Sequence, residues 1–290
     1  ISRYLNLCAW LTVFEWIRGW FLTGFPWNIL GSTLTFNLEA MQVASLIGGY
    51  GLTLIVCLIG AAPGIWLCEK KSSKAIIALS IILTLSSFLW GFGFLRLKNA
   101  DTTLSQTRIR IVQPSILQTL KWSPASLRDN FQKHLDLSNS ESKEDIAVTI
   151  WSETASPYPL DINDEARNLI FQNFAGQYLI AGQIRHETDY YEGWKSYNSA
   201  LVIKKDGQIE NYYDKSHLVP FGEYIPLRRF LPSSVRPVAD IIANLTAGNG
   251  PKTIRIKDIP SFGIQICYEI IFPHQILDYN DKPQWLINIR

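Results

Sequence analysis

The hydrophobic and polar positions divide the chain into two parts. Residues 1 to 95 contain eight charged side chains, which leaves 44 of the 52 for residues 96 to 290. Three apolar stretches, 4–23, 41–68 and 75–95, reach the roughly 20 residues that a helix needs to cross a bilayer, and the second and third contain no charge. Buried helices of soluble proteins usually keep a polar stripe. We therefore predict a bundle of transmembrane helices in residues 1–98.

Charged residues in this first part bear on its packing and orientation. Glu15 and Arg18 are spaced i,i+3, so they either form an ion pair that faces protein or water, or Arg18 extends to the lipid headgroups. Lys70, Lys71 and Lys74 lie between the second and third stretches, whereas residues 24–40 contain no Lys or Arg. Loops rich in Lys and Arg stay in the cytoplasm, so the chain from residue 96 onward is predicted on the opposite side of the membrane.

From residue 105 onward, short β-rich runs alternate with turns and polar helical segments, which is typical of an α/β domain. Helices are predicted at 126–138 and 161–175, and Lys205-Asp206-Gly207 is predicted to form a hairpin turn. The predicted strands are 108–113, 146–151, 178–184, 199–204, 208–213, 253–257, 262–266 and 285–289.

The amino-acid composition of the chain excludes several classes of protein. The 27 Lys and Arg against 25 Asp and Glu give a formal charge of +2, which argues against a nucleic-acid-coating protein. The four cysteines lie mostly in apolar stretches and predict no disulfide framework, and no metal-ligand spacing is present. The sequence begins inside an apolar run and stops directly after the 285–289 strand, so we expect it to be a fragment.

Three polar residues follow predicted strands. Glu153, Lys215 and Cys267 each stand just beyond a strand end, where open α/β sheets place their chemistry. A nearby Glu can take the proton of a Cys, and a Lys ammonium can stabilise a thiolate or an oxyanion, so the three form a complete set for acyl transfer. Each has an ordinary alternative: a small buried hydrophobe for the Cys, a solvated turn residue for the Glu and surface charge for the Lys.

Three sequence blocks resemble a known family. They are Trp-Ser-Glu-Thr at 151–154, the run from Tyr-Asp-Lys-Ser-His-Leu to Glu-Tyr-Ile-Pro at 213–226, and Ile-Cys-Tyr-Glu-Ile-Ile-Phe-Pro at 266–273. These blocks are similar to the signatures of the nitrilase (carbon–nitrogen hydrolase) superfamily. Leu-Val-Pro-Phe-Gly-Glu-Tyr at 218–224 further resembles the membrane-bound apolipoprotein N-acyltransferase branch. The resemblance implies a nitrilase-like αββα sandwich in residues 105–290, C-terminally incomplete.

The resemblance also assigns residue roles. It implies that Glu153, Lys215 and Cys267 are catalytic and that Glu223, Tyr268 and Glu269 are auxiliary active-site residues. An exposed loop carboxylate is the alternative for Glu223. Trp122 matches a lipid or substrate contact, or else packs in the core or at the lipid interface. His217 is expected to be structural.

The implied activity is transfer of a fatty acyl chain from a membrane phospholipid, through a Cys267 thioester, to the N-terminal amine of a diacylglyceryl-cysteine apolipoprotein. Aromatic residues such as Phe221, Tyr224 and Trp122 are candidates for excluding water from the thioester. The resemblance implies a multi-pass bacterial inner-membrane protein with a periplasmic catalytic domain and no cofactor. Two alternatives stay open: a membrane-tethered amidase of the nitrilase type, and an inactive truncated lipid-binding remnant.

Overall fold

The computed structural model describes residues 1–290 except 141–144, 173, 190–192 and 228–243. The chain forms two compact units, Ile1–Leu104 and Ser105–Arg290.

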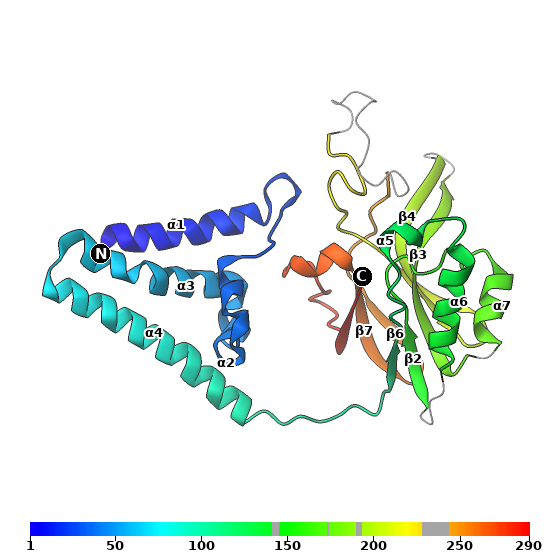
Figure 1. Cartoon of the computed structure of the whole chain (residues 1–290), viewed down its shortest axis with the longest axis horizontal. Coiled ribbons are helices and arrows are strands. Elements are labelled where there is room, and N and C mark those ends of the chain that lie inside the picture. Colours follow the sequence, from blue (N-terminus) through cyan, green and yellow to red (C-terminus); the bar gives the residue numbers. More distant parts are fainter. Residues whose placement is uncertain (141–144, 173, 190–192, 228–243) are drawn as a thin grey trace. The chain divides into compact units, whose positions relative to one another are not determined.

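The first unit is helical (Figure 1). Buried side chains such as Tyr4, Cys8, Cys57 and Ala78 pack α1, α3 and α4 against one another. The elements are α1 (Ser2–Arg18), the 3₁₀ turns η1 (Phe21–Thr23) and η2 (Leu30–Phe36), α2 (Leu38–Met41), α3 (Ala44–Glu69) and α4 (Ser72–Lys98). The backbone of α3 departs from helical geometry at Gly48, whose φ is +67°.

Two helices of this unit, α3 and α4, are long and apolar enough to cross a membrane. Only 33% of the most apolar stretch of α3 and 11% of that of α4 is buried, whereas a core helix of a soluble protein is mostly buried. The predicted span at 4–23 is shorter than expected, because α1 ends at Arg18 after 17 residues. At 1.5 Å per residue it is about 25 Å long, less than the ~30 Å hydrocarbon core.

The Glu15–Arg18 pair faces protein, as one of the two sequence interpretations expected. Arg18 Nη2 lies 3.2 Å from Glu15 Oε1. The other carboxylate oxygen accepts hydrogen bonds from the Leu30 amide (2.8 Å) and the Thr53 hydroxyl (3.1 Å), while Arg18 donates to the Phe25 carbonyl (2.6 Å). The pair therefore joins the connection after α1 to Thr53 of α3.

A close approach between α2 and α4 gives a first testable prediction. A Cβ on Gly93 would lie 1.9 Å from the Glu39 carbonyl oxygen, whereas a Cβ on Gly91 of the same helix would meet nothing within 4 Å. We expect Gly93→Ala to lower the free energy of unfolding by about 1–3 kcal/mol through overpacking. Gly91→Ala should be neutral or stabilising, because Ala is the better helix former. Thermal unfolding in detergent measures both, and equal melting temperatures would contradict this packing.

The second unit contains two sheets (Figure 1). In the larger sheet, β1, β2 and β3 run parallel, and β4 and β5 continue antiparallel. In the smaller sheet, β7 pairs antiparallel with β6 and parallel with β8. The strands are β1 (Ile109–Ile111), β2 (Ile146–Ile150), β3 (Gly176–Asp189), β4 (Gly193–Lys204), β5 (Ile209–Asp214), β6 (Thr253–Ile256), β7 (Ile259–Ile266) and β8 (Trp285–Ile289).

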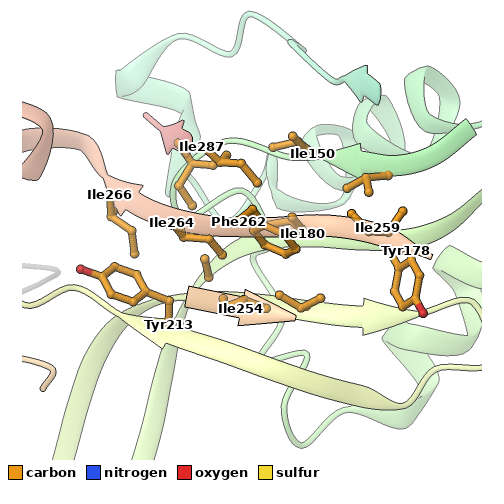
Figure 2. Packing of buried hydrophobic residues seen from close by; sticks show 14 residues of the cluster. Ile150, Tyr178, Ile180, Tyr213, Ile254, Ile259, Phe262, Ile264, Ile266 and Ile287 are labelled. Atoms are coloured by element: carbon orange, nitrogen blue, oxygen red, sulfur yellow. The ribbon is translucent and has the colours of Figure 1, made fainter. Parts of the chain in front are cut away.

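The two sheets pack face to face. Figure 2 shows Phe262 and Ile264 of β7 among Ile180, Tyr178 and other side chains of the larger sheet. A second core fills the opposite face of the larger sheet, where α6 (Leu127–Ser138) and α7 (Asp164–Phe171) lie (Figure 1). The predicted nitrilase-like sandwich is confirmed, and the described residues supply one helical layer and both sheets.

Most predicted elements are present with shifted ends. All eight strands and the hairpin turn, where Gly207 has a φ of +83°, form as expected. Strands β3 and β4 begin or end several residues beyond the predicted ranges because they form one long hairpin. The helix predicted at 161–175 is shorter: it begins after Asn163, whose side chain accepts a hydrogen bond from the Ala166 amide, and it ends at Phe171. The short α5 (Gln118–Lys121) was not predicted.

Candidate active site

Cys267 occupies a sharp turn at the end of β7. It is the first residue of the 3₁₀ turn η5 (Cys267–Ile271) and has a φ of +52°. Non-glycine residues rarely adopt this left-handed conformation, which is often found at functional sites. The thiol is partly buried, and the Glu153 carboxylate lies close enough to raise its pKa. The turn therefore presents the sulfur to a carboxylate instead of burying it in the apolar core.

Glu153 lies on a loop that crosses tightly over β3. The Ser156 amide donates to the carbonyl of Gly182 in β3 (3.2 Å). A Cβ on Gly182 would lie 2.5 Å from the Ser152 carbonyl oxygen and 2.6 Å from the Thr154 nitrogen, the two neighbours of Glu153. A glycine at this position is what lets the loop approach the strand and carry the Glu153 carboxylate to the sheet edge.

Lys215 follows β5 directly and its side chain is 1% exposed. Its ammonium lies 2.9 Å from Glu223 Oε1 and 3.8 Å from Glu153 Oε1. The Glu153 and Glu223 side chains are 18% and 11% exposed. The structure therefore brings the three predicted residues Glu153, Lys215 and Cys267 together and adds the predicted Glu223.

Asn198 of β4 joins the two carboxylates and was missed by sequence reasoning. Its side-chain nitrogen donates to Glu153 Oε1 (2.7 Å) and to Glu223 Oε1 (3.1 Å), and its backbone carbonyl accepts from the Lys215 amide (2.8 Å). Asn198 is buried. The one signal in the sequence was the position of the Asn198 amide close to the apolar run 200–203. The sequence of a strand does not show which groups such a side chain contacts.

Glu269 links the Cys267 turn to the segment that follows Lys215. One carboxylate oxygen, Oε1, accepts from the Tyr213 hydroxyl (2.8 Å), the Ser216 amide and hydroxyl (2.7 and 2.8 Å) and the His217 amide (3.1 Å). The other, Oε2, accepts from the Ile266 amide (2.8 Å). The buried carboxylate thus holds the Lys215 and Cys267 segments in one arrangement.

Tyr268 and His217 pack together beside this network. The His217 ring stacks on Phe272 with centroids 3.7 Å apart and lies 5.8 Å from the ring of Tyr268. His217 Nδ1 lies 2.8 Å from Gln275 Oε1. Tyr268 is buried. These contacts fit the prediction that His217 is structural, and they place Tyr268 next to the nucleophile in a packed position.

The charges around Cys267 oppose one another. Burial raises the pKa of the Cys267 thiol, and the neighbouring Glu153 carboxylate raises it further, while the Lys215 ammonium lowers it. Glu153 is thus a nearby carboxylate that can accept the thiol proton, and Lys215 is the nearby cation that favours the thiolate. This arrangement suits a nucleophile that is deprotonated during attack.

Trp122 lies next to this site, directly after α5. It lines a cavity of about 180 Å³ together with Lys121, Ser152 and Thr154, so the cavity reaches both neighbours of Glu153. Lys121 Nζ donates to the Glu153 carbonyl oxygen (2.9 Å). Within the part of the chain that the structure describes, no group of three or more His, Cys, Asp or Glu side chains is placed to hold a metal ion.

Known sequences match the chain along nearly its whole length. Residues 108–288 match the carbon–nitrogen hydrolase family, and residues 1–62 match the apolipoprotein N-acyltransferase N-terminal domain. The chain is 33% identical over 304 residues to an apolipoprotein N-acyltransferase of Rhodopseudomonas palustris, covering 99% of the chain and 56% of that protein. It is 35% identical over 285 residues to one of Brucella suis, covering 95% and 53%. The chain thus spans little more than half the length of these relatives.

Similar folds occur among solved structures. Nit3 of Saccharomyces cerevisiae, a member of the nitrilase superfamily, has a TM-score of 0.37 at 23% identity and covers 61% of each chain. An amidase of Nesterenkonia sp. AN1 has a TM-score of 0.39 at 14% identity, covering 61% of this chain and 62% of its own. These TM-scores are low, so the family membership rests on the sequence matches.

Proposed function

This chain belongs to the carbon–nitrogen hydrolase family, and we propose that it transfers a fatty acyl chain from a membrane phospholipid to the N-terminal amine of a diacylglyceryl-cysteine apolipoprotein. The observation that carries the proposal is the cluster around Cys267. The Glu153 carboxylate and the Lys215 ammonium both act on the pKa of its thiol, and the buried Lys215 lies between Glu153 and Glu223. The similarity to apolipoprotein N-acyltransferases over nearly the whole chain supports the choice of substrates.

In the first step, Glu153 accepts the thiol proton and the Cys267 sulfur attacks the ester carbonyl carbon of the phospholipid. Lys215 stabilises the negative charge on the carbonyl oxygen in the tetrahedral intermediate. The carbon–sulfur bond forms, the ester carbon–oxygen bond breaks, and the proton on Glu153 passes to the departing glycerol oxygen. The products are a thioester on Cys267 and a lysophospholipid.

In the second step, the α-amine of the apolipoprotein cysteine attacks the thioester carbonyl. The carbon–nitrogen bond forms and the carbon–sulfur bond breaks. Glu153 takes a proton from the amine and returns one to the Cys267 sulfur, which restores the enzyme and leaves an amide. Two successive half-reactions through one covalent intermediate predict ping-pong kinetics.

The roles of Glu223, Tyr268, Glu269 and Trp122 follow from their places in this scheme. Glu223 and Asn198 hold Lys215 and Glu153 at their present distances, and Glu269 and Tyr268 support the Cys267 turn. Trp122 contacts lipid from the cavity beside Glu153.

The membrane unit brings this chemistry to its lipid substrates. Helices α3 and α4 are joined by a connection that carries Lys70 and Lys71, with Lys74 in the first turn of α4. The preference of basic loops for the cytoplasm supports a position of the second unit on the periplasmic side of a bacterial inner membrane. Both proposed substrates are anchored in that membrane, so a tethered active site meets them at high local concentration.

The proposal is tested by incubating the membrane-reconstituted chain with a phospholipid whose acyl chain carries a tag. We expect a hydroxylamine-labile tag on the Cys267 peptide by mass spectrometry, and its transfer to an added diacylglyceryl-cysteine peptide. Cys267→Ala should carry no tag, whereas Cys68→Ala, which removes an exposed thiol of the other unit, should be labelled like the wild type.

Two outcomes would contradict the proposal. A tag that is released only to water identifies a hydrolase. Absence of any tag, together with hydrolysis of small amides that Cys267→Ala abolishes, identifies an amidase of the nitrilase type.

A further inference from the structure

The cavity beside Glu153 has the composition of an anion site. The described residues that line it supply the cations Lys121 and Arg290, the imidazole of His134, and the amide or hydroxyl groups of Gln113, Asn130 and Thr154. Neither Asp nor Glu occurs among these lining residues. The Glu153 carboxylate is engaged instead by Asn198 (2.7 Å) and is shared with Lys215.

Lys121 is a partly buried cation without a carboxylate hydrogen-bond partner. Among the described residues, its ammonium donates only to the Glu153 backbone carbonyl (2.9 Å), which leaves two of its three N–H donors for another acceptor. Burial lowers the pKa of Lys121, while Glu153 and Cys267 raise it. Lysine is rarely buried unless it is paired with an anion, so this position favours a negatively charged ligand.

His134 provides a second unsatisfied group in the same cavity. The residue is 1% exposed, and its Nδ1 lies 2.8 Å from the Asn130 carbonyl oxygen. Since a carbonyl only accepts, Nδ1 carries a proton. Nε2 then carries a lone pair that has no hydrogen-bond partner among the described residues, so it can accept from an N–H or O–H group of a ligand or from water but does not donate to a phosphate oxygen.

The cavity is also placed where the phosphate of a phospholipid would have to lie. In a glycerophospholipid, both acyl esters and the phosphate are carried by the three carbons of one glycerol, so the phosphate lies within a few bonds of whichever ester the nucleophile attacks. Lys121 is close enough to both Glu153 and Cys267 for their charges to act on it. Ser152 and Thr154, the neighbours of Glu153, lie in the cavity wall.

We propose that this cavity binds the phosphate group of the acyl donor, with the Lys121 ammonium as its charged hydrogen-bond donor. The inference rests on the proposed function and specifies how the donor is held. A phosphate site would make the chain prefer phospholipids over neutral diacylglycerols that carry the same acyl chains.

The test compares two acyl donors, a phospholipid and a diacylglycerol with the same tagged chain, using the rate of thioester formation on Cys267. We expect Lys121→Met to slow labelling from the phospholipid by about 10- to 100-fold, the range for a lost charge-assisted hydrogen bond. Labelling from diacylglycerol should change by less than about twofold, within the range of neutral substitutions. Lys121→Arg should retain most of the preference. Lys133→Met removes the same charge from an exposed position of α6 and should affect neither donor.

The outcomes separate the two proposals. Equal losses with both donors, in a Lys121→Met protein that melts like the wild type, would show that Lys121 only positions Glu153 and would overturn the phosphate site. No loss with either donor would overturn it as well. Strong inhibition of both donors by millimolar inorganic phosphate would identify free phosphate as the ligand instead of a headgroup. A wild-type chain labelled by neither donor would contradict the proposed function itself.

Discussion

Replacing Lys215 by Met is expected to abolish measurable acyl transfer and to destabilise the second unit. Lys215 is the ammonium between Glu153 and Glu223, and its side chain is 1% exposed. Losing one electrostatic contact to the oxyanion costs about 10²–10³ in rate. Removing the cation of a buried ion pair leaves carboxylates uncompensated, which typically costs about 3–5 kcal/mol; partial exposure of both carboxylates places the expected loss at the low end.

The alkylation rate of Cys267 distinguishes an electrostatic effect of Lys215 from simple unfolding. Lys215 lowers the pKa of the thiol and Glu153 raises it. Lys215→Met should therefore slow alkylation of Cys267 by iodoacetamide at neutral pH by about tenfold, since loss of an adjacent opposite charge shifts a pKa by a unit or more. Glu153→Gln should speed alkylation while it still prevents acyl transfer. Alkylation rates against pH, with melting temperatures, measure both effects.

A second variant separates the stability effect from the catalytic one. Adding Glu223→Gln to Lys215→Met removes a carboxylate that the first change leaves unpaired, and it should recover part of the lost stability without recovering activity. If Lys215→Met melts at the wild-type temperature and alkylates at the wild-type rate, the ion cluster has a different arrangement from the one described.

Replacing Glu269 by Ala is expected to reduce stability and acyl transfer by a comparable amount. The reason is that the Lys215 and Cys267 segments lose their positions, not that a charge beside the reacting atoms is removed. Its carboxylate accepts hydrogen bonds from three backbone amides, those of Ser216, His217 and Ile266. A buried amide left without an acceptor costs about 1–3 kcal/mol. The Ile266 amide is buried and the other two are partly buried, so Glu269→Ala should lower the free energy of unfolding by about 3 kcal/mol. The Lys215 and Cys267 segments would then lose their shared anchor, and thioester formation should fall with stability.

Tyr213→Phe is the matched control for this prediction. It removes one of the donors to Glu269, a hydroxyl 2.8 Å from Oε1, and leaves the three amides satisfied. Burial and the Glu269 carboxylate raise the pKa of Tyr213, so the lost donor is a neutral hydroxyl and should cost about 1 kcal/mol. Chemical unfolding in detergent, with thioester labelling of the folded protein, tests the pair. Equal costs for the two variants would rule out the anchoring role of Glu269.

The pattern of apolar and polar residues was sufficient to predict the strands of the second unit from the sequence. Apolar runs bounded by turn residues located all eight strands, because a strand with a buried face imposes its pattern on consecutive residues. The ends were less accurate. The helix expected at 161–175 begins later because Asn163 caps it, and the span expected at 4–23 ends at Arg18, where that side chain turns to the carbonyl of Phe25.

The chemistry-bearing residues Glu153, Lys215 and Cys267 were identifiable in the sequence because each follows a strand and stands in a recognisable block. The distances between these three residues could not be predicted from the sequence. Glu153 and Cys267 come from different sheets, and their meeting depends on the packing of β2 and β5 of one sheet against β7 of the other. Asn198 and Lys121 had no comparable signal, because a strand amide and a lysine after a short helix acquire meaning only from the carboxylate and carbonyl that they contact.

The sequence by itself therefore determined which residues are candidates for acyl transfer and which segments are apolar enough for a membrane, since both depend on residue type and local spacing. The tertiary structure alone decided that Lys215 is buried between two carboxylates, that Glu269 joins two distant segments, and that Lys121 and His134 share a cavity without acidic side chains. Those properties arise from contacts between residues far apart in the chain, whose energies depend on burial and distance rather than on sequence order.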